Sequence, residues 1–204
     1  MLVVRIEEFD KKKSRIILEN NESYVLYKSE RYKLAIEEGQ EVTKEMGEEI
    51  YQILKKRAKK RCLYLLQKMD RTKQQLIERL KKDGYPSEII EEAISYVEGF
   101  HYIDDTRYAK HYISSGSRTK SRRQLSFELE QKGVSSEIIR EELETMDIVE
   151  EDVVKEQIKK KYGRIDITEE KNKQKIFRYF CNKGFSYEKV KVAYQKYLEE
   201  FTQF

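Results

Sequence analysis

Two adjacent carboxylates, Asp104 and Asp105, are the residues of this sequence whose types and spacing come nearest to a catalytic centre. A carboxylate pair can hold the Mg²⁺ ion of a metal-dependent nuclease. No third acidic residue stands at a spacing that would complete such a site. The same carboxylates can accept hydrogen bonds from the free amides of a helix N-terminus, and the second could pair with Arg107. We interpret the pair as a helix start, with nuclease chemistry as the less favoured alternative.

Other catalytic and cofactor-binding patterns are missing from the sequence. Neither histidine, His101 or His111, belongs to a Ser, Cys or Asp constellation for nucleophilic catalysis. None of the eight glycines forms a G-x-x-x-x-G-K-[ST] phosphate loop. Cys62 and Cys181 are far apart, and we interpret each as a buried thiol. The sequence therefore predicts a protein that is not an enzyme and that uses no metal or other cofactor.

Lysine and arginine are the candidate ligand-binding residues, because they occur in runs with acidic segments between them. The net charge is only +4, so the distribution of charge says more than its total. One such run is usually a solvated helix face, but several predict a basic surface for phosphate groups or for an acidic protein. We expect Arg122 and Arg123 to be exposed. The candidate residues are Lys55, Lys56, Arg57, Lys59, Lys60, Arg118, Lys120, Arg122, Arg123, Lys159, Lys160, Lys171, Lys173 and Lys175.

A glycine-centred pattern that could position these cations recurs three times along the chain. In each copy a helical stretch ends at the glycine, and a cap residue and an apolar stripe follow. The glycines are Gly84, Gly133 and Gly184. In the middle copy a first helix begins at Asp104/Asp105, and a third begins at Ser135. The pattern predicts three tandem modules of three helices that pack on their neighbours.

The fold expected from this pattern is mainly α-helical, with the repeats in an elongated, curved array. Short apolar runs at 2–6, 15–18 and 24–27 predict a small antiparallel β-sheet. A short helix is expected at 30–37 and a further strand at 40–42. The predicted domains are a β-rich extension at 1–42 and three-helix repeats at 43–98, 99–146 and 147–204. A loop at 163–170 interrupts the third repeat, where we expect Thr168 to cap the next helix.

The N-terminal residues 1–4 are apolar but are soon followed by charged residues, so a signal peptide is not expected. No apolar run approaches the ~20 residues of a membrane span. A cytoplasmic location is therefore expected.

The middle repeat resembles the signature of the RecX family. It has Ile-Asp-Asp-x-Arg-Tyr-Ala at 103–109, which includes Arg107 and Tyr108, and Arg-Gln-Leu-x-x-Glu-Leu-x-x-Lys-Gly-Val at 123–134. The resemblance extends from about Arg71 to the C-terminus, and the outer repeats match more loosely. Family members often carry Gly or Gly-Pro just before the second helix, whereas this chain has Arg-Thr-Lys-Ser at 118–121.

The resemblance implies a monomeric regulator of the RecA recombinase, acting in DNA repair, recombination and the SOS response. Such a protein would lie in the groove of the RecA–DNA filament and would most often inhibit strand exchange and ATP hydrolysis. It would also bind DNA without sequence specificity, and more weakly alone. The residues by themselves leave a second interpretation open, a nonspecific DNA-binding helical module that has no recombinase partner.

Overall fold

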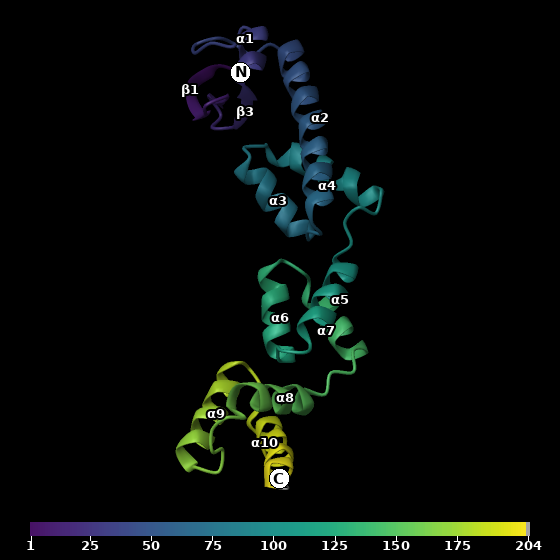
Figure 1. The fold of residues 1–204 in the computed structure, drawn as a ribbon. Coiled ribbons are helices and arrows are strands. Elements are labelled where there is room, and N and C mark those ends of the chain that lie inside the picture. The colour runs from purple at the N-terminus through teal and green to yellow at the C-terminus, as the bar shows by residue number, and fades with distance from the viewer. Residues whose placement is uncertain (203–204) are drawn as a thin grey trace. The chain divides into compact units, whose positions relative to one another are not determined.

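The computed structural model describes residues 1–202 and divides into two compact units, Met1–Asp104 and Asp105–Phe204 (Figure 1). Unit 1 begins with three strands and a short helix, followed by the three helices of module 1. Their bounds are β1 Val3–Asp10, β2 Lys13–Leu18, β3 Ser23–Tyr27, α1 Lys28–Lys33, α2 Lys44–Lys68, α3 Lys73–Lys82 and α4 Ser87–Gly99. Unit 2 holds module 2, which is α5 Asp105–Gly116, α6 Arg122–Gln131 and α7 Ser136–Thr145, and module 3, which is α8 Glu150–Tyr162, α9 Glu170–Asn182 and α10 Tyr187–Thr202.

The expected antiparallel sheet is present, with its strands in the order β1-β2-β3. Ile16 at its centre pairs with Ile6 on one side and Tyr24 on the other. β1 runs beyond the predicted end at residue 6, because its alternating residues continue the pairing as far as Asp10. The further strand expected at 40–42 is only an isolated bridge between Leu2 and Glu41.

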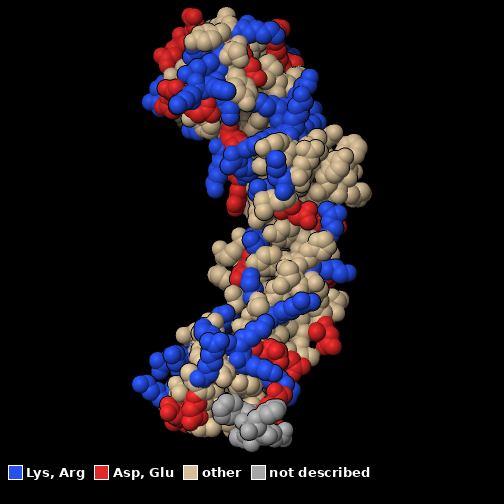
Figure 2. All heavy atoms as spheres, in the orientation of Figure 1, with Lys and Arg blue, Asp and Glu red and all other residues tan. Residues whose placement is uncertain are grey.

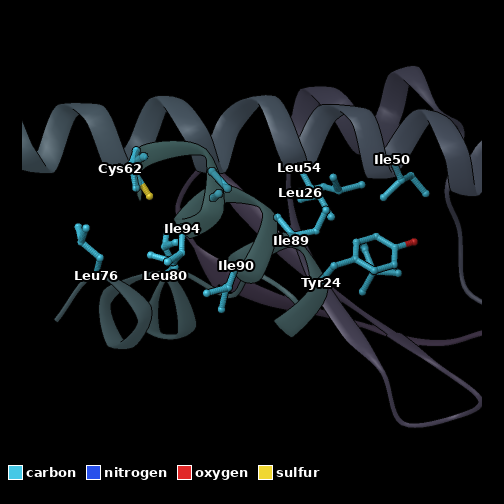
Figure 3. Packing of buried hydrophobic residues seen from close by; sticks show 14 of the residues in the cluster. Tyr24, Leu26, Ile50, Leu54, Cys62, Leu76, Leu80, Ile89, Ile90 and Ile94 are labelled. Carbon is cyan, nitrogen blue, oxygen red and sulfur yellow. The ribbon is translucent and has the colours of Figure 1, made fainter. Parts of the chain in front are cut away.

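The sheet and module 1 share one hydrophobic core (Figure 3). α2 begins at a side-chain cap, since the Thr43 side chain accepts a hydrogen bond from the backbone N–H of Met46 at 3.3 Å. The buried face of α2 is a stripe of Ile50, Leu54, Ala58, Cys62 and Leu65. Packing against a helix gives a small sheet independent stability, and the apolar side chains of this sheet share one buried cluster with those of α2.

Modules 2 and 3 each enclose their own cluster of buried side chains. The three pattern glycines have φ angles of +85°, +80° and +86°, the left-handed conformation expected after a helix end. The loop between α8 and α9 is present, but Thr168 does not cap α9, whose N-cap is Glu169. The backbone N–H and the hydroxyl of Thr168 instead donate hydrogen bonds to the Asp166 carboxylate. Ile167 is buried, and its carbonyl accepts the Tyr194 hydroxyl at 2.6 Å, which fixes this loop on α10.

No helix within residues 1–202 is both long enough and apolar enough to cross a membrane.

Candidate functional site

The basic run of α2 is divided among three faces of the helix, because residues four apart share a face. Lys55 and Lys59 point toward α4, where their ammonium groups lie 2.6 and 3.9 Å from the Glu92 carboxylate. Hydrogen bonding from Lys55 and then from Tyr51 lowers the pKa of Glu92. These two lysines are therefore partly neutralised within module 1.

Arg57 points the other way, toward the sheet, and is largely engaged there. Its guanidinium is 2.7 Å from the Glu30 carboxylate and also donates to the Val25 carbonyl. It lies over the rings of Tyr27 and Tyr85, at 5.0 and 5.5 Å from the centroids. Arg57 thus joins β3, α1 and module 1, and few of its donors remain for a ligand.

Lys56 and Lys60 occupy the third face of α2, where both are exposed. Neither forms an ion pair within residues 1–202. Lys60 also lines a pocket of about 490 Å³ whose walls combine cations with aromatic rings. Sequence patterns did not indicate this pocket, because its lining comes from five separate elements and the loop after α3. The other lining residues are Phe9, Asp10, Lys13, Tyr27, Arg57, Arg61, Arg79, Asp83 and Tyr85.

Two of the four candidates in module 2 are exposed and two are engaged. Arg118 and Arg123 are exposed. The Lys120 ammonium contacts the Glu128 carboxylate and the Tyr112 hydroxyl, and hydrogen bonding to Glu128 raises the pKa of Lys120.

The expectation that Arg122 is exposed is wrong. Its side chain is half-buried, and its guanidinium donates to carbonyl oxygens at the end of α7 and beyond it: those of Leu143, Met146 at 3.0 Å and Ile148 at 3.5 Å. Carbonyls at a helix C-terminus have no partner within the helix, so a cation there satisfies them and favours the helix dipole. Arg122 therefore stabilises module 2.

In module 3 most of the predicted cations are exposed: Lys159, Lys160, Lys171 and Lys175. Lys173 is half-buried and lies 3.2 Å from the Glu170 carboxylate. On the face drawn in Figure 2, Lys and Arg gather over the α2–α3 part of unit 1 and over the α8–α9 part of unit 2, with some acidic side chains among them.

An aromatic site in module 3 was not predicted from the sequence. The ammonium groups of Lys161 and Lys183 lie 3.5 and 5.0 Å from the centroid of the Tyr179 ring. Hydrogen bonding to Lys183 lowers the pKa of the Tyr179 hydroxyl. A Tyr within a lysine-rich helix does not by itself indicate a site of this kind, because most Tyr side chains in helices pack in the hydrophobic core.

The contacts that join module 2 to module 3 were also missed. The Ser121 hydroxyl donates to the Lys183 carbonyl at 2.7 Å. The buried Glu150 carboxylate accepts the Arg122 backbone N–H at 2.8 Å and the Lys189 ammonium. Glu150 stands in an acidic stretch, so its sequence context indicates a solvated residue and does not reveal these partners.

The Asp104–Asp105 pair lies at a helix start, as expected, since α5 begins at Asp105. No group of three or more His, Cys, Asp and Glu side chains is arranged to hold a metal ion in the described part of the chain.

Comparison with known proteins agrees with the repeat pattern. Models of the first, second and third three-helix domains of RecX match residues 58–96, 104–143 and 149–193. The chain is 30% identical to regulatory protein RecX of Clostridium tetani, over 96% of this chain and 94% of that protein. It is 32% identical to regulatory protein RecX of Caldanaerobacter subterraneus, over 95% of this chain and 98% of that protein.

Two solved structures share the fold. A crystal structure of regulatory protein RecX has a TM-score of 0.63 at 22% identity, covering 94% of this chain and 98% of that chain. A crystal structure of RecX from Lactobacillus salivarius has a TM-score of 0.61 at 20% identity, covering 71% of this chain and 96% of that chain. With three family domains matched in order and relatives aligned over nearly its whole length, the chain belongs to the RecX family.

Proposed function

We propose that this protein regulates a RecA recombinase by binding the RecA–DNA filament, and that binding lowers strand exchange and ATP hydrolysis. The proposal is supported by family membership together with one structural observation. After the internal ion pairs are counted, a set of exposed cations is left on all three modules. They are Lys56, Lys60, Arg118, Arg123, Lys159, Lys160, Lys171 and Lys175.

These cations suit a phosphate backbone better than a base-reading site. Each Lys or Arg that neutralises a phosphate releases condensed counterions, which gives affinity without sequence preference and a strong dependence on salt. Six of the fourteen predicted binding residues, Lys55, Arg57, Lys59, Lys120, Arg122 and Lys173, are engaged within their own unit. The proposed surface is therefore narrower than the sequence indicates.

The test is a titration of this protein into RecA, single-stranded DNA and ATP, with the rate of ATP hydrolysis as the readout. The rate should fall at substoichiometric to equimolar protein. Unchanged hydrolysis and unchanged filament length across that range would rule out the proposal. A DNA-binding module with no recombinase partner would bind labelled DNA with a steep salt dependence but form no complex with RecA, with or without DNA.

The double charge reversal Arg118→Glu/Arg123→Glu tests the surface itself. Both side chains are exposed, so the fold should persist, while the salt slope of DNA or filament binding should fall by about 1 for each phosphate that is no longer neutralised. Lys191→Glu is the control for a single charge reversal, compared per charge reversed, because Lys191 is also exposed but lies on α10, outside the proposed surface. Equal effects of the two changes would remove the support for this surface.

A further inference from the structure

A pocket of about 570 Å³ in unit 1 lies where the sheet meets the starts of α2 and α4, and we call it the sheet–helix pocket. Its walls are mainly apolar, and its volume is within the ~300–1,000 Å³ range of ligand pockets. Figure 3 shows Tyr24 from the sheet near Ile50 from α2 and Ile89 from α4. The lining residues are Met1, Leu18, Glu22, Ser23, Tyr24, Val42, Gly47, Ile50, Tyr51, Leu54, Pro86, Ser87, Glu88 and Ile89.

Tyr24 in this wall has an unsatisfied polar group. The residue is only 7% exposed, and its buried hydroxyl has no hydrogen-bond partner in the structure. Burial raises the pKa of this hydroxyl to about 12. Buried polar groups are almost always paired, so an orphan hydroxyl beside a pocket calls for an explanation. In Figure 3 the hydroxyl points away from Ile89.

The charged side chains that line the sheet–helix pocket are acidic, namely Glu22 and Glu88, while the terminal ammonium of Met1, which also lines it, lies 3.8 Å from the Glu41 carboxylate. Glu48 and Glu92 stand near Tyr51 in the same wall, and hydrogen bonding to Glu92 together with these charges raises the pKa of Tyr51 to about 12. The lysines of α2 reach Glu92, whereas Glu22, Glu48 and Glu88 form no ion pair within residues 1–202. In a chain with more Lys and Arg than Asp and Glu, this surface is locally negative.

We propose that the sheet–helix pocket binds a bulky apolar side chain from a basic segment of a partner protein. The apolar side chain fills the space between the sheet, α2 and α4. Lys or Arg residues of the partner face Glu22 and Glu88, and a carbonyl of the partner accepts the Tyr24 hydroxyl. The acidic rim repels a phosphate backbone, so this site is distinct from the basic surface proposed above for DNA. The inference goes beyond the proposed regulation and does not depend on it.

Gly47 offers a way to close the pocket without disturbing the backbone. It lies in the first turns of α2 and lines the pocket, and a Cβ atom built there meets nothing within 4 Å. Gly47→Phe would therefore place a ring at the pocket. Gly47→Ala is the matched control, because it adds one methyl group and favours the helix.

The experiment is a selection of peptides from a random phage-displayed library on the full chain. Enriched peptides should carry a bulky apolar residue flanked by Lys or Arg. Their dissociation constants, measured by fluorescence anisotropy, should rise by about tenfold or more with Gly47→Phe and by less than about twofold with Gly47→Ala. Tyr24→Phe should weaken binding by roughly twofold to tenfold, the value of one hydrogen bond. Glu22→Lys/Glu88→Lys changes only exposed side chains and should also weaken binding, which keeps the test valid if Gly47→Phe is misfolded.

Three results would overturn the proposal. The first is a library that yields no peptide sensitive to these variants, and the second is an enriched set that is acidic or lacks an apolar residue. The third is dimerisation of the wild-type chain in sedimentation that Gly47→Phe abolishes, since the occupant would then be a second copy. Because these measurements contain neither RecA nor DNA, their failure is separate from any failure of the proposed regulation.

Discussion

Replacing Glu150 with Ala should loosen the junction between modules 2 and 3. Glu150 is the first residue of α8 and is 5% exposed. Its carboxylate accepts the backbone N–H of Arg122, which opens α6, and the ammonium of Lys189 on α10. A single side chain therefore joins one helix of module 2 to two helices of module 3, and its removal should destabilise both modules.

The size of the effect follows from the two partners. Losing a side-chain acceptor at a helix N-terminus costs about 1 kcal/mol, and up to about 2 when the N–H is buried. Losing the ion pair adds less than about 1 kcal/mol, because the Lys189 side chain is 37% exposed and can be hydrated. The expected destabilisation by Glu150→Ala is therefore about 2 kcal/mol. Glu150→Gln keeps a neutral acceptor and should cost about half as much.

Hydrogen exchange read by mass spectrometry is the suitable assay, because a chain of two units need not unfold in one step. Peptides from α6 and α10 should exchange faster in Glu150→Ala, while those from unit 1 should not change. Glu151→Ala is the control, because Glu151 neighbours Glu150 and has no ion pair within the described residues. If both variants exchange at the wild-type rate in α6, the Glu150 carboxylate does not hold the junction.

Further predictions concern the core and the glycines. Burial raises the pKa of the Cys62 thiol from 9.0 to about 11, which means that the folded state favours the neutral thiol. The contribution of this thiol to the free energy of unfolding should therefore be present below pH 9 and disappear between pH 9 and 11, as measured by unfolding at a series of pH values. At neutral pH, iodoacetamide should modify half-buried Cys181 before Cys62. Gly184→Ala should destabilise the protein more than Gly39→Ala in thermal unfolding. Both glycines have a positive φ, but only at residue 184 would the new Cβ atom crowd a neighbour, because it would lie 2.8 Å from the Ser121 hydroxyl oxygen. Leu129→Asp should unfold module 2, seen as a decrease in helical circular dichroism, because Leu129 is fully buried.

Local signals were enough to place most helices. Thr43, Ser121 and Ser135 each accept a hydrogen bond from the first turn of the following helix, as residues of their type do. Thr168 is the exception, and its hydroxyl finds Asp166 two residues earlier. Ser and Thr side chains bond several nearby backbone and side-chain groups, so sequence alone does not decide which helix terminus such a residue serves.

The environment of each cation was harder to predict, because it depends on distant partners. Arg57 reaches Glu30 and Val25, and Arg122 reaches the carbonyls that follow α7. Helical periodicity tells which residues share a face, but it does not tell what packs against that face. The sheet–helix pocket could not be predicted for the same reason, because its walls come from the N-terminal sheet region and from two later helices.

The long helix α2 brings two different chemistries into unit 1. Its first half, which includes Gly47 and Leu54, lines the apolar pocket with the acidic rim. Its second half carries the exposed cations Lys56 and Lys60. A nucleoprotein offers both phosphates and apolar protein surface, so engaging both halves of α2 at once would exceed the affinity of either contact alone. If the partner that fills the pocket is the recombinase of the filament, Gly47→Phe and Lys60→Glu should each weaken filament binding, and Lys60→Glu should reduce its salt dependence more, because only Lys60 faces DNA phosphates. A salt slope reduced equally by both variants would mean that the two halves do not contact different parts of the partner.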